Sequence, residues 1–499
     1  MQNICLKEIY KEFPGVIANN KISIDFNCGE VHALLGENGA GKTTLMNIIY
    51  GIYQADEGDI FIDGKKVRIR NPKDAINHGI GMVHQHFMLV QNHTVTENVC
   101  LGLNEVSFFN PQKYFSEKLL EISEKYGLKI NPQAKIWQLS AGEQQRVEII
   151  KALIRGAKFL ILDEPTSVLT PLEVESLFKT IKNLVSNGLG VIFISHKLDE
   201  VFAISDRITV LREGKVIGTT TPSSTDKATL AKMMVGREIS FTFNKKQQVK
   251  KDGVLSVENL WIKGDKGVYS VKDISFNLNE GEILGIAGVS GNGQKELIEA
   301  LTGLRKSEKG EIKIFGKSAK NITAKDINNL GVAHIPEERL KYGAIPSFSL
   351  FENAILNNYD KEPISKNGLL NINLAKTKTK YLVEKFKISA PSMDTSIKLL
   401  SGGNIQKLIC ARELDSNPKI IIAAHPTYGL DVAATEFIRS LLVKKRDEGC
   451  AVLLVSEDLE EILCLSDRVL VFFSGIICGE FVPGNITMEE IGLMMAGAK

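Results

Sequence analysis

The stretch GENGAGKT at residues 36–43 decides the fold of this 499-residue chain. An apolar run at 31–35 precedes it and a helix-like run at 42–49 follows, which is the setting of a phosphate-binding P-loop. In such a loop, consecutive backbone N–H groups and a helix N-terminus point at phosphate oxygens. We therefore expect the loop to bind a nucleotide through Gly36, Glu37, Asn38, Gly39, Ala40, Gly41, Lys42, Thr43 and Thr44.

The same frame returns 252 residues later (288 − 36 = 252) as GVSGNGQK at residues 288–295. The glycines, the apolar runs and the helix faces on either side coincide without a gap, so the chain is an internal duplication. The second copy carries Gln294 where the first has Lys42, and Lys295 where the first has Thr43. Only one copy therefore keeps the residues that bind phosphate and metal.

A second pair of landmarks lies farther along, LSAGE at 139–143 and LSGGN at 400–404, with an offset of 261 (401 − 140). The nine extra residues (261 − 252 = 9) fit the polar stretch KEPISKNGLL at 361–370, which we expect to be a surface loop of a helical subdomain. Strands alternate with helices in each half, which predicts α/β domains around mostly parallel sheets. We expect a first domain at 1–241, a polar and basic linker at 242–253, and a second domain at 254–499.

Composition sets limits on the compartment and the partners. The chain is 43% apolar and 24% charged with a net charge of +2, so no excess of positive charge points to nucleic acid. The seven cysteines form no C-x-x-C pair, which favours a reducing cytosol over a metal site. Apolar runs are of strand length, well below the ~20 residues of a membrane span, and no signal peptide is visible. We expect a soluble chain.

Three further segments complete a nucleotide-hydrolysing site in the first half. The apolar run at 159–162 ends in Asp163 and Glu164, which would hold Mg²⁺ and polarise the attacking water. Gln85 follows a strand-like run and is placed to contact Mg²⁺ and the water. His196 ends the apolar run at 191–195, where it would contact the γ-phosphate. Phe13 precedes the P-loop at a distance that fits stacking on adenine, although core packing explains it almost as well.

The order of P-loop, Gln85, LSAGE, acidic strand end and His196 resembles the ATP-binding cassette (ABC) superfamily over essentially the whole chain. The resemblance implies two tandem P-loop NTPase domains, each a mostly parallel sheet core with an antiparallel β part and a helical subdomain. It also implies head-to-tail packing of the two cassettes. ATP would then lie between the P-loop of the first half and Ser401, Gly402 and Gly403 of the second, which also offer helix N–H groups to a phosphate. The implied cofactors are ATP and Mg²⁺, the latter held by Thr43, Gln85 and Asp163.

The second site lacks the decisive groups at every aligned position. Glu337 occupies the position of the glutamine, and Glu457 occupies that of the histidine. Ala424 and His425 occupy the positions of the acidic pair. Pro165-Thr166 recurs as Pro426-Thr427, so the register is secure. We expect one hydrolytic site per chain.

A fused double cassette with a sound first site and a decayed second one resembles the ATPase subunits of bacterial importers for simple sugars and nucleosides. LSGGNIQK, PEERLKYG and HPTYGLDV agree with that type, and the segment at 82–90 is more similar to the nucleoside importers than to the ribose or galactose ones. The resemblance implies two integral-membrane permeases, an extracytoplasmic substrate-binding protein or lipoprotein, no nucleic-acid partner, and a peripheral place on the cytoplasmic side of the cell membrane.

Three alternatives stay open. The first is the same role for a sugar such as ribose or galactose, and the second is a double-cassette protein that acts on the ribosome, which would keep both sites and carry a long charged linker. The third is a DNA-repair or chromosome ATPase, whose coiled coils or zinc modules have no counterpart here.

The sequence departs from the family motifs at two places. LSAGE replaces LSGGQ, and Thr170 occupies a position where aspartate is usual, whereas Asp431 occupies the equivalent position in the second half.

Overall fold

The P-loop joins a fully buried strand to a short helix. In the computed structural model, which describes residues 3–85, 87–103, 111–169, 171–239, 243–246, 253–495 and 497, strand β3 is Val31–Leu35 and helix α1 is Lys42–Ile49. In the second half, β13 is Ile283–Ala287 and α9 is Gln294–Leu301. The duplication is therefore confirmed in three dimensions. Thr170 and His86 lie outside the described residues.

The chain divides into two compact units, Met1–Ile239 with Asp431–Ala433, and Ser240–Leu430 with Ala434–Lys499. Part of the expected linker is described: Lys245 Nζ donates to the carbonyl oxygens of Leu465 (3.3 Å) and Ser466 (2.6 Å). This part of the linker lies against the second unit rather than standing free in solvent.

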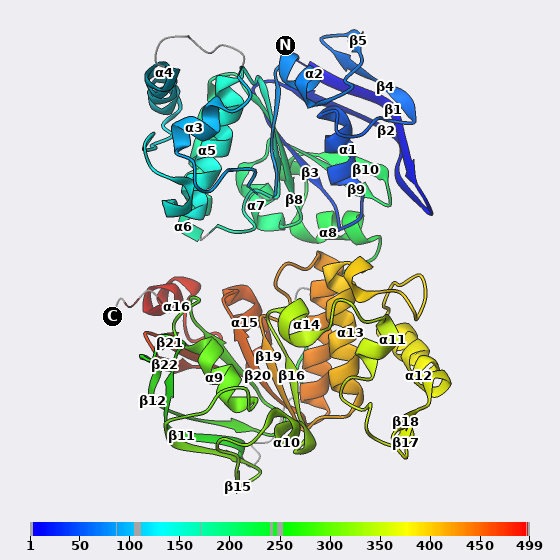
Figure 1. Cartoon of the computed structure of the whole chain (residues 1–499), viewed down its shortest axis with the longest axis vertical. Helices are drawn as coiled ribbons and strands as arrows, with labels where there is room; N and C mark the ends of the chain where they lie inside the picture. The colour runs from blue at the N-terminus through cyan, green and yellow to red at the C-terminus, as the bar shows by residue number, and fades with distance from the viewer. Residues whose placement is uncertain are drawn as a thin grey trace. The chain divides into compact units, whose positions relative to one another are not determined.

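The first unit pairs an antiparallel sheet (β2-β1-β4-β5) with a six-stranded sheet (β10-β9-β3-β8-β7-β6), in which only β10 is antiparallel to its neighbour. Its other elements are β1 (Asn3–Phe13), β2 (Val16–Asn27), β4 (Glu57–Ile62), β5 (Lys65–Val67), α2 (Pro72–Asn77), β6 (Ile80–Val83), α3 (Val95–Cys100), α4 (Pro111–Tyr126), η1 (Ile136–Gln138), α5 (Ala141–Ile154), β7 (Phe159–Asp163), α6 (Pro171–Ser186), β8 (Gly190–Ser195), α7 (Leu198–Ile204), β9 (Arg207–Arg212), β10 (Lys215–Thr220), η2 (Pro222–Ser224) and α8 (Lys227–Val235). Helices α3, α4 and α5 gather on the side away from the antiparallel sheet (Figure 1). The expected helical subdomain is thus present.

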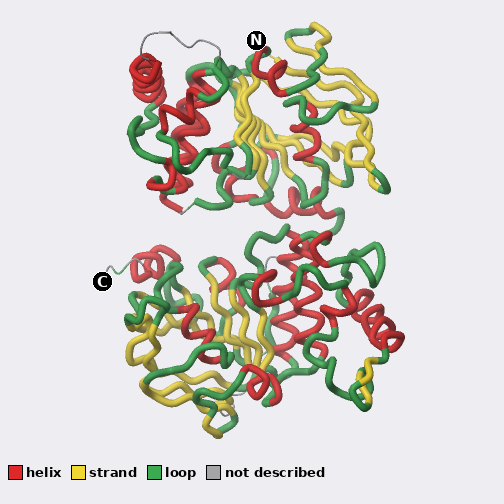
Figure 2. Tube along the Cα trace, viewed as in Figure 1, coloured by secondary structure: helices red, strands yellow, loops and turns green. Residues whose placement is uncertain are grey.

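The second unit repeats this plan, with sheets β12-β11-β14-β15 and β16-β19-β20-β13-β21-β22. Its other elements are β11 (Gly253–Lys263), β12 (Tyr269–Asn279), β14 (Lys309–Ile314), β15 (Lys317–Ser318), α10 (Ala324–Asn329), β16 (Val332–Ile335), η3 (Arg339–Gly343), α11 (Leu350–Ala354), β17 (Ser365–Lys366), β18 (Leu369–Leu370), α12 (Ile372–Lys385), η4 (Ile397–Leu399), α13 (Gly402–Asp415), β19 (Ile420–Ala424), α14 (Val432–Asp447), β20 (Ala451–Ser456), α15 (Leu459–Leu465), β21 (Arg468–Phe473), β22 (Ile476–Phe481) and α16 (Met488–Met495). Figure 2 shows helices flanking a central band of strands in each unit. The stretch at 361–370, expected to be a loop, contains the β17–β18 hairpin, and Leu369 and Leu370 are exposed.

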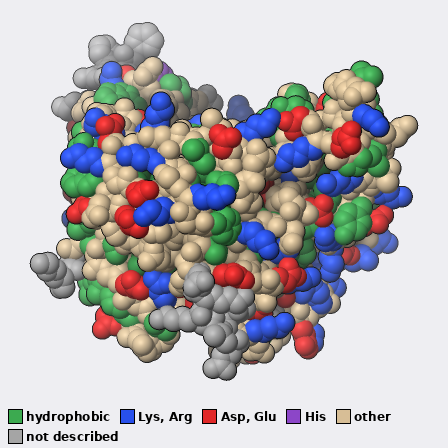
Figure 3. Space-filling view, turned by 90° about the horizontal axis from the view of Figure 1, so that it is seen from below, with side chains coloured by type: hydrophobic (Ala, Val, Ile, Leu, Met, Phe, Trp, Pro, Cys, Tyr) green, Lys and Arg blue, Asp and Glu red, His purple; other side chains and the backbone are tan. Residues whose placement is uncertain are grey.

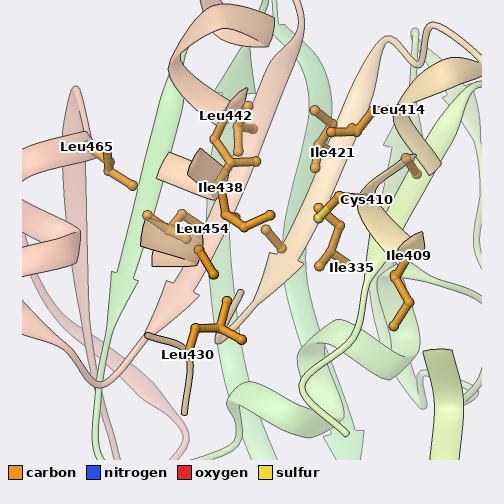
Figure 4. Packing of buried hydrophobic residues seen from close by; sticks show 14 of the residues in the cluster. Ile335, Ile409, Cys410, Leu414, Ile421, Leu430, Ile438, Leu442, Leu454 and Leu465 are labelled. Atoms are coloured by element: carbon orange, nitrogen blue, oxygen red, sulfur yellow. The ribbon is translucent and has the colours of Figure 1, made fainter. Parts of the chain in front are cut away.

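The core of the second unit anchors α13, the helix that begins within LSGGN. Ile409, Cys410 and Leu414 of α13 lie close to Ile335 of β16 and Ile421 of β19 (Figure 4). All five side chains are buried, so apolar burial fixes α13 against the sheet. The N-terminus of α13 is thereby held in a defined place.

Charges are mixed on the face drawn in Figure 3, where lysine and arginine side chains alternate with acidic ones. Within the part of the chain that the structure describes, no helix combines the length and the apolar character needed to cross a membrane.

Candidate functional site

The P-loop of the first unit needs glycine at two positions where another part of the backbone comes close. Gly41, which precedes α1, has φ +94°, and a Cβ there would lie 2.1 Å from the carbonyl oxygen of Ala18. A Cβ at Gly36 would lie 2.3 Å from the carbonyl oxygen of Leu211. Buried Asn19 donates to the Gly41 carbonyl at 3.0 Å. The loop therefore wraps tightly because glycine alone fits at these two positions.

Lys42 is held inside this loop. Its Nζ donates to the carbonyl oxygens of Gly36 (2.7 Å) and Glu37 (2.9 Å). Burial lowers the pKa of Lys42, and the nearby carboxylates of Glu164 and Asp163 act in the opposite direction. The ammonium is thus kept over the loop and close to two negative charges.

Asp163, the last residue of β7, is buried beside Glu164 and Thr43. Burial, and then repulsion by Glu164, raise the pKa of Asp163 from its ordinary 3.8 to about 6, while a hydrogen bond with Thr43 opposes the shift. Carboxylate, hydroxyl and amide oxygens are the ligands that Mg²⁺ prefers. An ionised Asp163 lacks a full compensating charge in this pocket, so the residues present fit a divalent cation.

Glu164 stands between the two other predicted catalytic residues. Gln85 Nε2 donates to its Oε2 at 2.9 Å, and His196 Nδ1 lies 3.0 Å from its Oε1. The bond with His196 is the main cause that lowers the pKa of Glu164. Its backbone φ of +46° lies in the left-handed region, which is uncommon for a residue other than glycine. The structure therefore brings Gln85, Asp163, Glu164 and His196 together at the edge where β6, β7 and β8 end.

Other expected site residues are in less constrained places. Asn38 and Gly39 are exposed, Thr43 is exposed, and Thr44 is half-buried on the first turn of α1. Phe13 ends β1 and meets the ring of Tyr53 edge-on at 5.4 Å, with Lys11 Nζ 5.4 Å from its centre. Its stacking on adenine stays a prediction.

The second P-loop has the same backbone but different contacts. Gln294 is buried and donates to the Val289 carbonyl at 3.1 Å, and its Oε1 has no hydrogen-bond partner among the described residues. The backbone N–H of Ser290 donates to the Glu457 carboxylate, at the position where the first half has His196. His425 keeps a left-handed φ of +44°, although it carries no carboxylate.

The two signature segments begin similar helices. Ser401 accepts a hydrogen bond from the Asn404 N–H (3.4 Å) at the start of α13, and Ser140 and Glu143 form a capping box at the start of α5. Ser401, Gly402 and Gly403 belong to the second unit, and their role at the first unit's nucleotide stays a prediction.

Sequence reasoning missed several residues around these motifs. Thr166 Oγ1 donates to Glu200 at 2.7 Å, and Thr427 makes the same bond with Glu461 at 2.6 Å. Recurrence of the Thr/Glu pair at an offset of 261 could have revealed both (427 − 166 = 461 − 200 = 261). Arg339 lies against Gly402, where a Cβ would be 3.0 Å from its Nη1.

Comparison with known proteins agrees with this geometry. The family model "ABC transporter" matches residues 19–167 and 271–428. The chain is 47% identical to the guanosine import ATP-binding protein NupO of Bacillus subtilis, over 98% of this chain and 96% of the relative. It is 46% identical to the nucleoside import ATP-binding protein NupA of Lactococcus lactis (98% and 97%), and 39% identical to the galactose/methyl galactoside import ATP-binding protein MglA of Pasteurella multocida (98% and 96%).

Among solved structures, an archaeal ribosome recycling factor, aABCE1 in complex with the ribosomal stalk protein aP1, resembles the chain with a TM-score of 0.64. It is 19% identical and covers 98% of this chain and 92% of that one, which is evidence for the fold alone. The family model covers both halves, and the relatives match over nearly their full length. The chain is therefore a member of the ABC transporter family, an ATPase built from two tandem ATP-binding cassettes.

Proposed function

We propose that this chain is the ATP-hydrolysing subunit of an importer for nucleosides, bound peripherally to the cytoplasmic side of the membrane through two permease subunits. The observation that carries the proposal is the 46–47% identity, over 98% of the chain, with ATP-binding proteins named for guanosine and nucleoside import. A sugar is the second candidate solute, because a galactose importer protein is 39% identical over 98% of the chain. An extracytoplasmic binding protein or lipoprotein would deliver the solute.

Hydrolysis would use the carboxylate cluster at the end of β7. Glu164 polarises the water that attacks the γ-phosphorus; as that bond forms, the bond from the γ-phosphorus to the β–γ bridging oxygen breaks and ADP leaves. Both oxygens of this carboxylate are engaged, one by Gln85 (2.9 Å) and one by His196 (3.0 Å). We expect ATP to draw His196 toward its γ-phosphate, so that Glu164 becomes free to act on water.

The charged groups around Glu164 would stabilise the phosphates. Lys42 would exchange its two carbonyl partners for the β- and γ-phosphates. Mg²⁺, held by Thr43, Gln85 and Asp163, would neutralise developing charge on the phosphate oxygens. Ser401, Gly402 and Gly403 would complete the site from the second cassette, so that ATP holds the halves together and hydrolysis releases them.

A surface suited to the permeases lies beside Gln85. A cavity there is lined by Tyr50, Ile76, Met82, His84, Met88 and Arg155, and Met88 is 63% exposed. In the second unit, Leu340, Tyr342 and Phe348 are also exposed after the equivalent strand. Apolar groups of this kind next to polar ones are typical of a protein-binding surface. One such surface in each unit fits two permease subunits.

Reconstitution tests the solute. The chain, its two permeases and the binding protein are placed in proteoliposomes with ATP, and uptake of labelled nucleosides, pentoses and hexoses is compared. We expect nucleosides to enter and a Lys42→Ala chain to support none. Preferential uptake of a sugar would disprove the nucleoside assignment and leave the ATPase assignment intact. Co-sedimentation with ribosomes rather than with membranes that contain the permeases would disprove the importer assignment and likewise leave the ATPase assignment intact.

A further inference from the structure

The β17–β18 hairpin of the second unit presents two uncovered leucines. Lys366 pairs with Leu369 across the hairpin, and Ser365 pairs with Leu370. Successive residues of a strand point to opposite faces, so the two leucines lie on different faces of the hairpin. They are 77% and 50% exposed. Neither face of the hairpin is therefore covered by the described part of the chain.

The base of the hairpin is anchored although its tip is bare. Ile364 is buried in a small apolar cluster with Ile355 and Ala375, and its carbonyl oxygen accepts a hydrogen bond from the Asn371 N–H at 2.8 Å. Figure 1 shows the hairpin beside α12 at the margin of the unit. The leucines are thus held out by a fixed base.

Positive charge is concentrated around this tip. Helix α12, which follows the hairpin and starts with exposed Ile372, carries four lysines and one glutamate, whereas α4 in the first unit carries three of each. Lys366 and Lys380 are exposed and have no acidic partner among the described residues. Residues 361–387 carry a net charge of +5 (7 − 2 = 5), so the rest of the chain carries −3 (2 − 5 = −3).

Contacts within the second unit place the hairpin next to α10. Lys325 Nζ of α10 lies 2.7 Å from the carboxylate of Asp360, just before the hairpin. Helix α10 is the counterpart of α2 (72 + 252 = 324), and Ile76 of α2 lines the cavity that we assign to a permease. The hairpin therefore lies on the side of its unit that corresponds to the proposed permease surface. Because a permease lies in the bilayer, that side faces the membrane when the chain is docked.

We propose that the β17–β18 hairpin contacts anionic lipids of the membrane surface, with Leu369 and Leu370 inserted at the boundary between headgroups and acyl chains and with Lys366 and Lys380 near the lipid phosphates. The inference rests on the proposed function for the side of the unit that faces the membrane. The cytoplasmic leaflet is negatively charged, and it attracts lysines that lie beside an apolar anchor.

The size and the charge of the patch favour lipid over a protein partner. A stable protein interface buries about 800 Å² on each side and is depleted of lysine at its centre. Two leucines and one isoleucine among lysines are less than such an interface needs. A bilayer needs only a few apolar side chains, because the lysines add an attraction of their own.

Co-sedimentation with protein-free vesicles tests the proposal on the full-length chain. We compare vesicles of phosphatidylcholine alone with vesicles that also contain phosphatidylglycerol. The wild type should bind the anionic vesicles, less so as salt is raised, and should bind the neutral ones much more weakly. A Leu369→Ser, Leu370→Ser chain should bind about tenfold more weakly, and a Lys366→Gln, Lys380→Gln chain about fivefold more weakly for each lysine lost.

Both double variants should keep the wild-type melting temperature and ATP turnover, because all four side chains are exposed and none belongs to the nucleotide site. Val268→Ser is the matched control, since this valine is 69% exposed at the turn between β11 and β12 of the same unit, and it should not change binding.

No binding of the wild type to anionic vesicles, equal binding to neutral ones, or an equal loss with Val268→Ser would overturn the proposal. Binding only to vesicles that contain the permeases would also overturn it, because the partner would then be a protein. Absence of nucleoside uptake in the reconstituted importer would instead overturn the proposed function.

Discussion

Replacing Asp163 with asparagine should stabilise the nucleotide-free chain at pH 8 while it abolishes ATP hydrolysis. The pKa of Asp163 rises from 3.8 to about 6 because the carboxyl is buried and lies beside Glu164. A difference of about 2 pKa units corresponds to about 3 kcal/mol at a pH above both values. The ionised side chain therefore costs the folded first unit up to about that amount, and a neutral amide of the same size avoids most of it.

The sign of the pH dependence follows from the same shift. Between pH 3.8 and about 6 the folded chain binds the proton more tightly than the unfolded chain, so stability falls as pH rises through this window. Above pH 6 the whole cost is present, and at pH 5 roughly half of it. The gain from Asp163→Asn should accordingly shrink from about 3 kcal/mol at pH 8 to about 1.5 kcal/mol at pH 5.

Calorimetry measures the change in stability of the first unit. In the wild type, the unfolding transition of this unit is identified as the one whose melting temperature MgATP raises. For a unit of this size, the expected gain is a rise in melting temperature of several degrees, up to about 10 °C. Glu164→Gln is the contrasting variant. Its carboxylate has a lowered pKa because of His196, so the ionised form contributes stability above its ordinary pKa, and the substitution should destabilise at pH 8. No gain in the Asp163→Asn chain at pH 8, or an equal gain at pH 5, would refute the reasoning.

Three further predictions concern function. Glu164→Gln should lower ATP turnover by on the order of 10²- to 10⁴-fold, whereas His425→Ala, the substitution at the aligned position, should leave it within about twofold of wild type; equal losses in a phosphate-release assay would contradict a single hydrolytic site. Gly41→Ala should abolish ATP binding and lower the melting temperature, because its Cβ would lie 2.1 Å from a backbone oxygen, whereas Gly39→Ala, which also has a positive φ but open space around it, should cost only about 1–2 kcal/mol. Arg339→Ala should raise the KM for ATP about tenfold with little change in kcat, as expected for a cation that assists phosphate binding; an unchanged KM would show that Arg339 does not serve the nucleotide.

Local pattern was enough to predict the elements that carry the first site. The run at 31–35 and the helix at 42–49 are found with these bounds as β3 and α1, since a short, mostly apolar run before a glycine-rich loop is typical of a buried strand. Helix α5 begins at Ala141, within LSAGE, because Ser140 and Glu143 form a capping box at its start. Capping by side chains extends a helix beyond its apolar periodicity.

Contacts between segments far apart in sequence could not be predicted in this way. Glu173 reaches Gly142 across 31 residues, and whether it does so depends on where α6 begins relative to α5. From the sequence alone, Glu173 is an acidic residue near a helix start, and such residues are common on protein surfaces. The Gln85–Glu164 bond, across 79 residues, is specified by the order of β6 and β7 in the sheet, which follows from the fold and not from either residue.

The comparison of the two halves separates what the fold requires from what the chemistry requires. Glu164 and His425 share a left-handed φ, and in each the backbone N–H is bonded to the next strand, to Ile194 at 3.1 Å and to Val455 at 2.8 Å. The conformation has therefore persisted in a half that has no carboxylate to position, so it is imposed by the way the strand ends, and the glutamate uses a turn that exists for structural reasons. The buried Thr/Glu bond after that turn is likewise present in both halves. The second cassette has lost its acidic pair and its lysine, yet it keeps this framework and a buried signature helix. The framework therefore serves the fold of each cassette, whereas the acidic pair and the lysine serve only the chemistry of the first.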